Sequence, residues 1–235
     1  MAGILFIISA PSGSGKSTLV SQLRSLVEGL DFSISYTTRQ PRGSEEEGRE
    51  YHFTTRQQFE KMIAAGEFLE WAEVFGNYYG TALSAIDHAR AAGKDLLLDI
   101  DVQGAVQVMQ KLPSAVSIFI LPPSPAILEQ RLRNRSEAEH MTAEDVIARR
   151  LAEARKELDR IREYRYALVN DNLDIAVSEL RAIVLTERAL TERAFTERAQ
   201  TERGTSDGIT AIAASCRTGA RSPRLLQALA SFNKP

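Results

Sequence analysis

The chain is poor in cysteine, tryptophan and net charge. Cys216 is the single cysteine among 235 residues, so no intrachain disulfide or cysteine-based metal site can form, which favours a reducing, cytoplasmic compartment. A formal net charge of −2 predicts neither a nucleic-acid nor a membrane partner. Long apolar runs are missing too: no stretch approaches the roughly 20 residues of a membrane span, and the charged start of a signal peptide is not expected here. The length suits one α/β domain with a sizeable core plus an appendage.

Glycine is concentrated directly behind the first apolar run. Residues 10–18 read A-P-S-G-S-G-K-S-T, after the apolar run 4–8 and before an amphipathic run at 19–27. A strand, a glycine-rich turn and a helix start in this order form a cradle for nucleotide phosphates, because backbone N–H groups and the positive helix end point inward. Lys16 can reach the β- and γ-phosphates, and the Ser17 hydroxyl can ligate Mg²⁺. The pattern therefore predicts an ATP-binding loop made of Ala10, Pro11, Ser12, Gly13, Ser14, Gly15, Lys16, Ser17 and Thr18, with Ala10 where the strict motif has glycine.

Strand-like apolar runs alternate with helical patterns along most of the chain. We expect strands at 4–9, 32–37, 95–99, 116–121 and 167–170, and helices at 16–27, 56–65, 83–91, 102–110, 125–134, 142–164 and 173–183. This alternation predicts an α/β fold with a parallel central sheet covered by helices on both faces, hence three layers.

Two aspartates follow one of the predicted strands. Ligands in parallel sheets bind at the carboxyl ends of the strands, so Asp99 and Asp101 are expected at the same edge as the 10–18 loop. Asp99 suits a position beside Mg²⁺, partly through water, by analogy with other P-loop enzymes. The alternative for either aspartate is to cap the helix that begins near Val102.

The composition changes at about Leu185. Four five-residue units that each contain Thr-Glu-Arg fill 185–204, and residues 205–235 are rich in Ser, Gly and Ala. A period of five does not match 3.6 residues per turn, so the apolar residues of the repeats would wind around a helix. We expect a repeat segment at 185–204 and a poorly ordered tail at 205–235, an appendage without a catalytic role. A partner-binding helix is the alternative.

A second group of motifs gives the chain a family resemblance. The segments are T-T-R-x-x-R-x-x-E-x-x-G-x-x-Y-x-F at 37–53, F-L-E-W-A at 68–72, G-N-Y-Y-G-T at 76–81, L-L-D-I-D-V-Q-G at 97–104 and V-N-D at 169–171. In this order they resemble the guanylate kinases, nucleoside monophosphate kinases of the P-loop NTPase superfamily. The resemblance covers about 3–184. It implies a core of 3–34, 83–125 and 166–184, a GMP-binding subdomain at 35–82 and a helical lid at 126–165.

The implied reaction is Mg²⁺-assisted phosphoryl transfer from ATP to GMP, which gives ADP and GDP. Arg39 and Arg42 are three residues apart, so their forked donors can converge on the acceptor phosphate. Guanine presents N1–H and an exocyclic amine side by side, which ionised carboxylates accept and which adenine lacks. The resemblance implies a GMP site of Ser35, Arg39, Arg42, Tyr51, Glu70, Tyr79, Thr81 and Asp101.

The donor side completes the implied site. The basic segment at 131–135 resembles the mobile lid of this class of kinase. The implied catalytic residues are Lys16, Arg39, Arg131, Arg135 and Arg150, where Arg150 could exchange its role with Arg149. Asn170 is expected to contact adenine or to orient the arginines, and Ser17 and Asp99 to hold Mg²⁺. The partners are ATP and GMP, and the sequence leaves open whether the chain forms a homo-oligomer.

Two alternatives stay open at this point. A related P-loop kinase could act on another phosphorylated acceptor, such as a ribose bisphosphate, although that acceptor has no guanine edge for Glu70 and Asp101. A non-catalytic interaction module related to guanylate kinases is the other alternative. The presence of Lys16, Ser17 and Arg39 disfavours it, because such modules have eroded phosphate loops.

Overall fold

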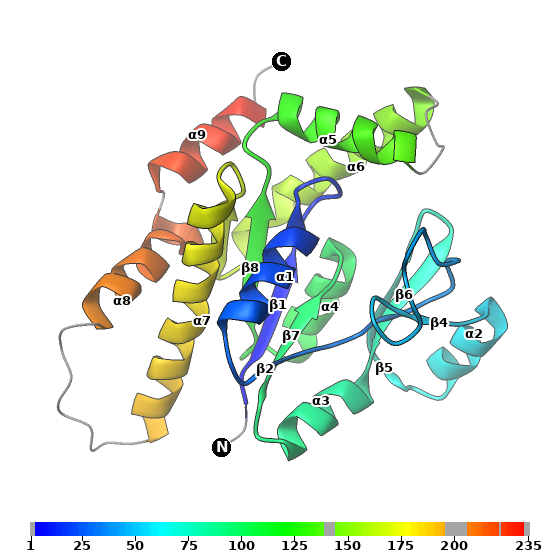
Figure 1. Cartoon of the computed structure of the whole chain (residues 1–235), viewed down its shortest axis with the longest axis horizontal. Helices are drawn as coiled ribbons and strands as arrows, with labels where there is room; N and C mark the ends of the chain where they lie inside the picture. Colours follow the sequence, from blue (N-terminus) through cyan, green and yellow to red (C-terminus); the bar gives the residue numbers. More distant parts are fainter. Residues whose placement is uncertain (1–2, 139–143, 196–205, 221, 233–235) are drawn as a thin grey trace. The chain divides into compact units, whose positions relative to one another are not determined.

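The computed structural model of the chain describes residues 3–138, 144–195, 206–220 and 222–232 (Figure 1). The chain forms two compact units, one of residues 1–7 with 29–115 and one of residues 8–28 with 116–235. The first strand, β1 (Leu5–Ser9), contributes residues to both units. No helix in the described part of the chain has the length and apolar character needed to cross a membrane.

The principal sheet has five strands in the order β2-β7-β1-β8-β9. Its pairs β2–β7 and β8–β9 are parallel, and the second pairs Leu121 with Val169. The interiors of β1, β7, β8 and β9 are buried and mostly apolar, as expected for parallel strands covered on both faces. An α/β class with a parallel central sheet is thereby confirmed. Besides β1, the strands are β2 (Leu30–Phe32), β7 (Asp95–Asp99), β8 (Val116–Leu121) and β9 (Tyr166–Val169).

The first unit also contains a four-stranded sheet in the order β4-β3-β6-β5. Its strands are β3 (Tyr36–Thr37), β4 (His52–Phe53), β5 (Phe68–Val74) and β6 (Asn77–Ala82). The helices of this unit are α2 (Arg56–Ala64), α3 (Leu83–Ala91) and α4 (Val102–Lys111). The single strand expected at 32–37 is wrong, because β2 and β3 belong to different sheets.

The β5–β6 hairpin is absent from the elements predicted from the sequence. Val74 pairs with Asn77, and the two residues between them, Phe75 and Gly76, have φ of 50° and 82°. Two positive φ angles define a tight turn whose usual sequence is Asn-Gly or Asp-Gly. Because phenylalanine occupies the first of these positions, the sequence lacks the residue pair that usually indicates such a turn.

The second unit packs its helices around β8 and β9. Helix α1 contacts α7, α5 contacts α6, α8 contacts α7, and α9 contacts β9. The helices are α1 (Lys16–Leu26), α5 (Pro125–Ala138), α6 (Glu144–Leu158), α7 (Leu173–Phe195), α8 (Ser206–Ser215) and α9 (Pro223–Phe232), with short 3₁₀ turns at Asp159–Glu163 and Thr218–Ala220.

The C-terminal segment differs from the poorly ordered tail that its composition suggested. Helix α7 continues through the first two repeats, and α8 and α9 follow, while residues 196–205 lie outside the described ranges. The appendage buries Ala213, Cys216, Leu225 and Ala228. Most of these buried side chains are small, so a composition rich in Ser and Ala did not indicate that α8 and α9 pack against the rest of the second unit.

Candidate active site

The loop between β1 and α1 has the backbone of a phosphate cradle. Gly13 and Gly15 have φ of 88° and 83°, angles that glycine adopts without a steric penalty. A Cβ on Gly15 would lie 2.4 Å from the side-chain nitrogen of Asn170, so the loop needs glycine there for space as well. Helix α1 begins at Lys16, which opens its first N–H groups toward the loop. Within the described ranges Phe75 is the one non-glycine residue with positive φ, so Ala10 has a backbone that alanine tolerates.

A buried polar contact joins this loop to the end of β9 and to α5. Asn170, only 6% exposed, donates from Nδ2 to the Ser14 carbonyl at 2.7 Å. Arg131 donates from Nη1 to the same carbonyl and from Nη2 to the Asn170 carbonyl, both at 3.2 Å. These three predicted site residues therefore meet in the second unit.

The other two lid arginines are placed differently. Arg150 is 4% exposed on α6, whereas its neighbour Arg149 is exposed, so Arg150 is the one on the inner face of the helix. The backbone of Arg135 lies in α5, and its side chain is outside the described residues.

In the first unit a buried arginine is held by a carboxylate and two tyrosines. Arg39 donates from Nη2 to Glu45 Oε1 at 3.0 Å, its Nη1 lies 2.9 Å from Glu45 Oε2, and its Nε donates to the Tyr79 hydroxyl at 3.2 Å. Its Cζ lies 5.3 Å from the centre of the Tyr51 ring. Glu45 also accepts from the Arg42 backbone N–H at 2.8 Å. Burial, with a smaller contribution from Asp99, raises the pKa of Tyr51 to about 12, so its hydroxyl stays protonated and can donate.

Sequence reasoning gave Glu45 no role. In the structure Glu45 is the side chain that orients Arg39. The signal was available in the motif itself, which carries a glutamate six residues after its first arginine. A carboxylate beside a guanidinium holds that guanidinium in one orientation through parallel hydrogen bonds.

A second cluster forms where β5 and β6 meet the start of α4. A register shift at Leu69 sets Glu70 opposite Thr81, and the Thr81 hydroxyl donates to Glu70 Oε1 at 2.6 Å. Such a bulge redirects the side chains of its strand. A Cβ on Gly104 would lie 2.2 Å from Glu70 Oε2, so any other residue there would displace this carboxylate.

Two carboxylates thus lie near one another in a largely buried place. Burial, opposed by the Thr81 hydrogen bond and assisted by the charge of Asp101, raises the pKa of Glu70 to about 7. Asp101 caps α4, since its Oδ1 accepts from the N–H groups of Gln103 and Gly104 at 2.7 and 3.0 Å. The cap that the sequence left open is therefore formed by Asp101, and it uses one of two carboxylate oxygens.

The remaining predicted residues occupy the positions that the strand ends provide. Asp99 is the last residue of β7 and is partly buried. Ser35 is buried and directly precedes β3, whose register pairs Tyr36 with Gly80, so Ser35 lies at the Thr81 end of that pair. All of the acceptor-side residues belong to the first unit, and the phosphate loop with Arg131, Arg150 and Asn170 belongs to the second.

These features define a class: a P-loop α/β protein with a separate polar cluster suited to a second nucleotide. A family model described as guanylate kinase matches residues 3–187. The chain is 62% identical over 188 residues to a guanylate kinase of Koribacter versatilis, covering 80% of each chain. It is 49% identical over 188 residues to a guanylate kinase of Escherichia coli K12, covering 79% of this chain and 89% of that one. A crystal structure of guanylate kinase from Anaplasma phagocytophilum aligns with a TM-score of 0.65 at 31% identity, covering 83% of this chain and 96% of that one. The chain belongs to the guanylate kinase family.

Proposed function

We propose that the protein is a guanylate kinase, an enzyme that transfers a phosphoryl group from ATP to GMP and releases ADP and GDP. The observation that carries this proposal is the buried carboxylate of Glu70, which accepts a hydrogen bond from Thr81 and lies near the partly exposed carboxylate of Asp101. An ionised carboxylate accepts the two adjacent N–H donors of guanine, whereas adenine would place an acceptor against it. The named relatives support the same activity.

On the acceptor side, Arg39 and Arg42 bind the GMP phosphate. Glu45 holds the Arg39 guanidinium in place before the substrate arrives, which lowers the entropy that binding must overcome. The hydroxyls of Tyr51 and Tyr79 add two neutral donors to the same phosphate oxygens. No strong general base is required, because the GMP phosphate is already an anionic nucleophile.

On the donor side, residues 10–18 hold the ATP phosphates. Lys16 contacts the β- and γ-phosphates, and the three arginines Arg131, Arg135 and Arg150 stabilise the charge of the migrating group. Asn170 holds the loop through the Ser14 carbonyl. Positive charge placed before reaction need not reorganise during it, which is the main source of rate enhancement in phosphoryl transfer.

Mg²⁺ fits the oxygen donors of this chain. Ser17 supplies a hydroxyl and Asp99 a carboxylate, the hard ligands that Mg²⁺ prefers. Among the described residues no three acidic, histidine or cysteine side chains are placed so that they could hold a metal ion together, and Mg²⁺ bound mainly by substrate phosphates and water needs none. The ion would neutralise charge on the transferring phosphate. A cytoplasmic location, expected from the single cysteine, stays a prediction.

The test is an acceptor panel with the full chain. ADP production is measured with Mg²⁺-ATP and GMP, AMP, CMP or a ribose bisphosphate as acceptor. Among these acceptors we expect only GMP to support ADP production. Lys16→Ala should lower kcat by about 100-fold or more. Glu70→Gln should lower kcat/KM for GMP by about 10- to 100-fold. Equal use of AMP would contradict the roles of Glu70 and Asp101. Absence of ATP binding in calorimetry would instead favour a non-catalytic interaction module.

A further inference from the structure

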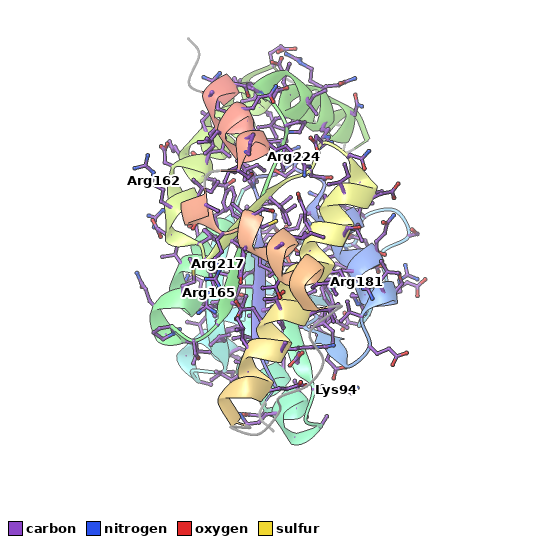
Figure 2. All side chains as sticks on the ribbon, turned by 90° about the vertical axis from the view of Figure 1, so that its left-hand side faces the viewer. Lys94, Arg162, Arg165, Arg181, Arg217 and Arg224 are labelled. Atoms are coloured by element: carbon purple, nitrogen blue, oxygen red, sulfur yellow. The ribbon has the colours of Figure 1, made fainter. Side chains whose placement is uncertain are left out.

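The C-terminal appendage covers the outer edge of β9. Residues 206–220 and 222–232 lie beyond the part of the chain that the family model matches. The Ala167 N–H donates to the Cys216 carbonyl at 2.7 Å, and Tyr166 pairs with Arg217 in an antiparallel bridge. Since β9 is the last strand of its sheet, the appendage satisfies an edge that would otherwise offer free backbone groups. Figure 2 faces this side and labels Arg217 and Arg224, its two anchoring arginines.

Arg217 anchors the appendage at the start of β9. Its Nη2 lies 3.8 Å from Glu187 Oε1, and its Cζ lies 5.2 Å from the centre of the Tyr166 ring. Glu187 itself is buried and accepts from the Tyr166 hydroxyl at 2.6 Å and from Arg165 at 3.0 Å. This anchor contacts none of the predicted site residues.

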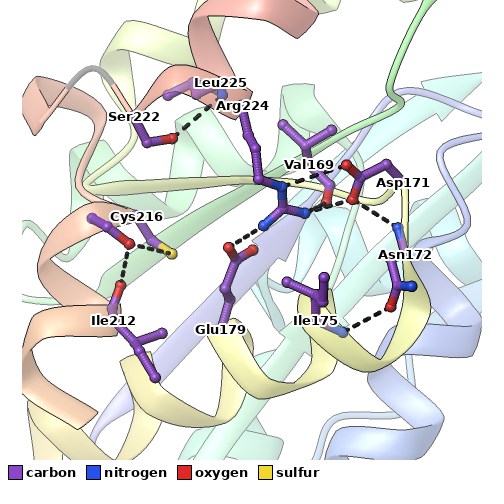
Figure 3. A network of polar contacts seen from close by, with 11 residues as sticks. Val169, Asp171, Asn172, Ile175, Glu179, Ile212, Cys216, Ser222, Arg224 and Leu225 are labelled. Carbon is purple, nitrogen blue, oxygen red and sulfur yellow. Dashed lines mark hydrogen bonds and ion pairs between the residues drawn. The ribbon is translucent and has the colours of Figure 1, made fainter. Parts of the chain in front are cut away.

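Arg224 anchors the appendage at the other end of β9 (Figure 3). Its Nη2 donates to Asp171 Oδ1 at 2.5 Å and to the Val169 carbonyl at 3.1 Å. Its Nη1 donates to Glu179 on α7. One guanidinium therefore binds the residues on both sides of Asn170, as Figure 3 shows for Val169 and Asp171.

Asn170 is the link between this anchor and the phosphate loop. Its backbone N–H donates to the Leu121 carbonyl at 2.8 Å, and its side chain donates to Ser14. Its carbonyl accepts from Arg131, so the two bonds to Ser14 and the bond to Arg131 depend on one backbone position. The amide nitrogen also occupies the space that a Cβ of Gly15 would need, so it packs closely against the loop.

The last turn of α9 makes a second contact near the phosphate loop. Phe232 packs against the cluster of Leu128, Leu132 and Ala154 on α5 and α6. Leu128 and Leu132 are also the side chains nearest to Gly13, 3.2 and 3.1 Å from the position of a Cβ there. The first turn of α9 thus contacts the neighbours of Asn170, and its last turn contacts side chains that lie beside Gly13 of the phosphate loop.

We propose that Arg224 is a positioning residue for ATP binding, which fixes the backbone at 169–171 and, through Asn170, the carbonyl of Ser14 and the guanidinium of Arg131. This inference rests on the proposed function, because it takes residues 10–18 as the ATP site. Loss of Arg224 removes none of the groups that bind ATP. It removes the hydrogen bonds that hold the backbone at 169–171, and this backbone aligns those groups. ATP and ADP then bind more weakly, whereas GMP affinity is unchanged, since the GMP residues belong to the first unit.

The experiment compares Arg224→Ala with Arg217→Ala in the full chain. Both substitutions remove an arginine through which the appendage contacts a glutamate of α7, and only the first touches residues beside Asn170. ADP affinity is measured by calorimetry without GMP, and KM for ATP and for GMP by ADP release. We expect about a 3- to 10-fold weaker ADP affinity and higher KM for ATP in Arg224→Ala, the size typical of mutations that act through a neighbour. KM for GMP should not change, and Arg217→Ala should bind ADP as the wild type does.

Two results would overturn the proposal: unchanged ADP affinity in Arg224→Ala, or an equal loss in both variants, which would indicate general loosening of the appendage. If Arg224→Ala does not fold, the ADP affinity of Arg224→Lys is measured instead. Lysine keeps the charge but lacks the fork that reaches Asp171, Val169 and Glu179 together. An intermediate loss of ADP affinity supports the proposal, and wild-type affinity contradicts it. The acceptor panel on the wild type tests the proposed function separately, because ADP binding requires no phosphoryl transfer.

Discussion

At the scale of single residues, Glu70 combines burial with a need for charge. Its carboxyl must be ionised to accept two guanine N–H donors, yet burial first and Asp101 second raise its pKa to about 7. Bound guanine would lower that pKa again, because it hydrogen-bonds the ionised form. GMP affinity therefore depends on pH, because the Glu70 carboxyl of the empty site must lose its proton before it can accept the guanine N–H groups.

We predict that GMP affinity falls as the pH is lowered from 8 to 6. With a pKa of about 7, roughly nine tenths of the Glu70 carboxyls are protonated at pH 6, which gives up to a tenfold weaker affinity. Calorimetric titration of the protein with GMP at each pH measures this affinity. The GMP phosphate also titrates near pH 6, so Glu70→Gln is the control that retains only that contribution. Equal pH slopes for both proteins would refute the prediction.

The same shift has the opposite consequence for the stability of the empty protein. The native Glu70 carboxyl binds its proton more tightly than the unfolded one, because its pKa is raised from 4.5 to about 7. Its contribution to the free energy of unfolding therefore decreases as the pH rises through that interval. Substrate affinity and stability respond to pH in opposite directions at this residue.

At the scale of elements, the turn of the β5–β6 hairpin carries strain. Phe75 has φ of 50° and is 44% exposed. A side chain with a Cβ is disfavoured in this left-handed region, and asparagine tolerates it best. The hairpin holds Glu70 and Thr81, so the turn helps to set the register of the acceptor site.

We predict that Phe75→Asn raises the free energy of unfolding by about 0.5–1 kcal/mol, since asparagine relieves the backbone strain at the first turn position. Urea unfolding of the two proteins measures the change in midpoint. Phe75→Ala is the matched control, because it removes the ring but keeps a residue that disfavours positive φ. A gain of the same size in the alanine variant would mean that the exposed ring, and not the backbone, was responsible.

How far the sequence predicts these elements depends on how local their causes are. The bounds of α3 and β7 agree with expectation at both ends, because apolar periodicity and flanking polar residues determine them. The two-residue strands β3 and β4 depend on pairing with each other and with β6, which no local pattern records. The close approach of Gly104 to Glu70 is likewise a contact between segments that only folding brings together, whereas the Arg39–Glu45 pair joins two residues of one motif.

At the scale of the whole molecule, α8 and α9 contribute to the folded core of the second unit. Their buried residues include Ala213 and Leu225, and a large side chain such as that of Leu225 stabilises by about 1.5–3 kcal/mol when it is removed from water. The composition of this segment predicts an appendage without a catalytic role, and the structure adds that the appendage packs on β9 and α7.

We predict that a chain ending at Phe195 unfolds at a lower temperature than the full chain and loses a few kcal/mol of stability. Hydrogen exchange provides the sharper measurement. The Ala167 amide should exchange faster once the Cys216 carbonyl is gone, whereas the Leu96 amide, bonded to Ile4 in the first unit, should not change. Unchanged protection at Ala167 would show that the appendage does not occupy the edge of β9 in solution.

The covering of β9 by residues 216–217 also bears on the order of folding. The edge strand β9 is followed by the long helix α7, and the residues that cover its edge come only later in the chain. Domains generally fold during synthesis from the N-terminus. During synthesis β9 therefore has unpaired backbone groups until residues 216–217 have emerged, and an unpaired edge strand can pair with a strand of another chain.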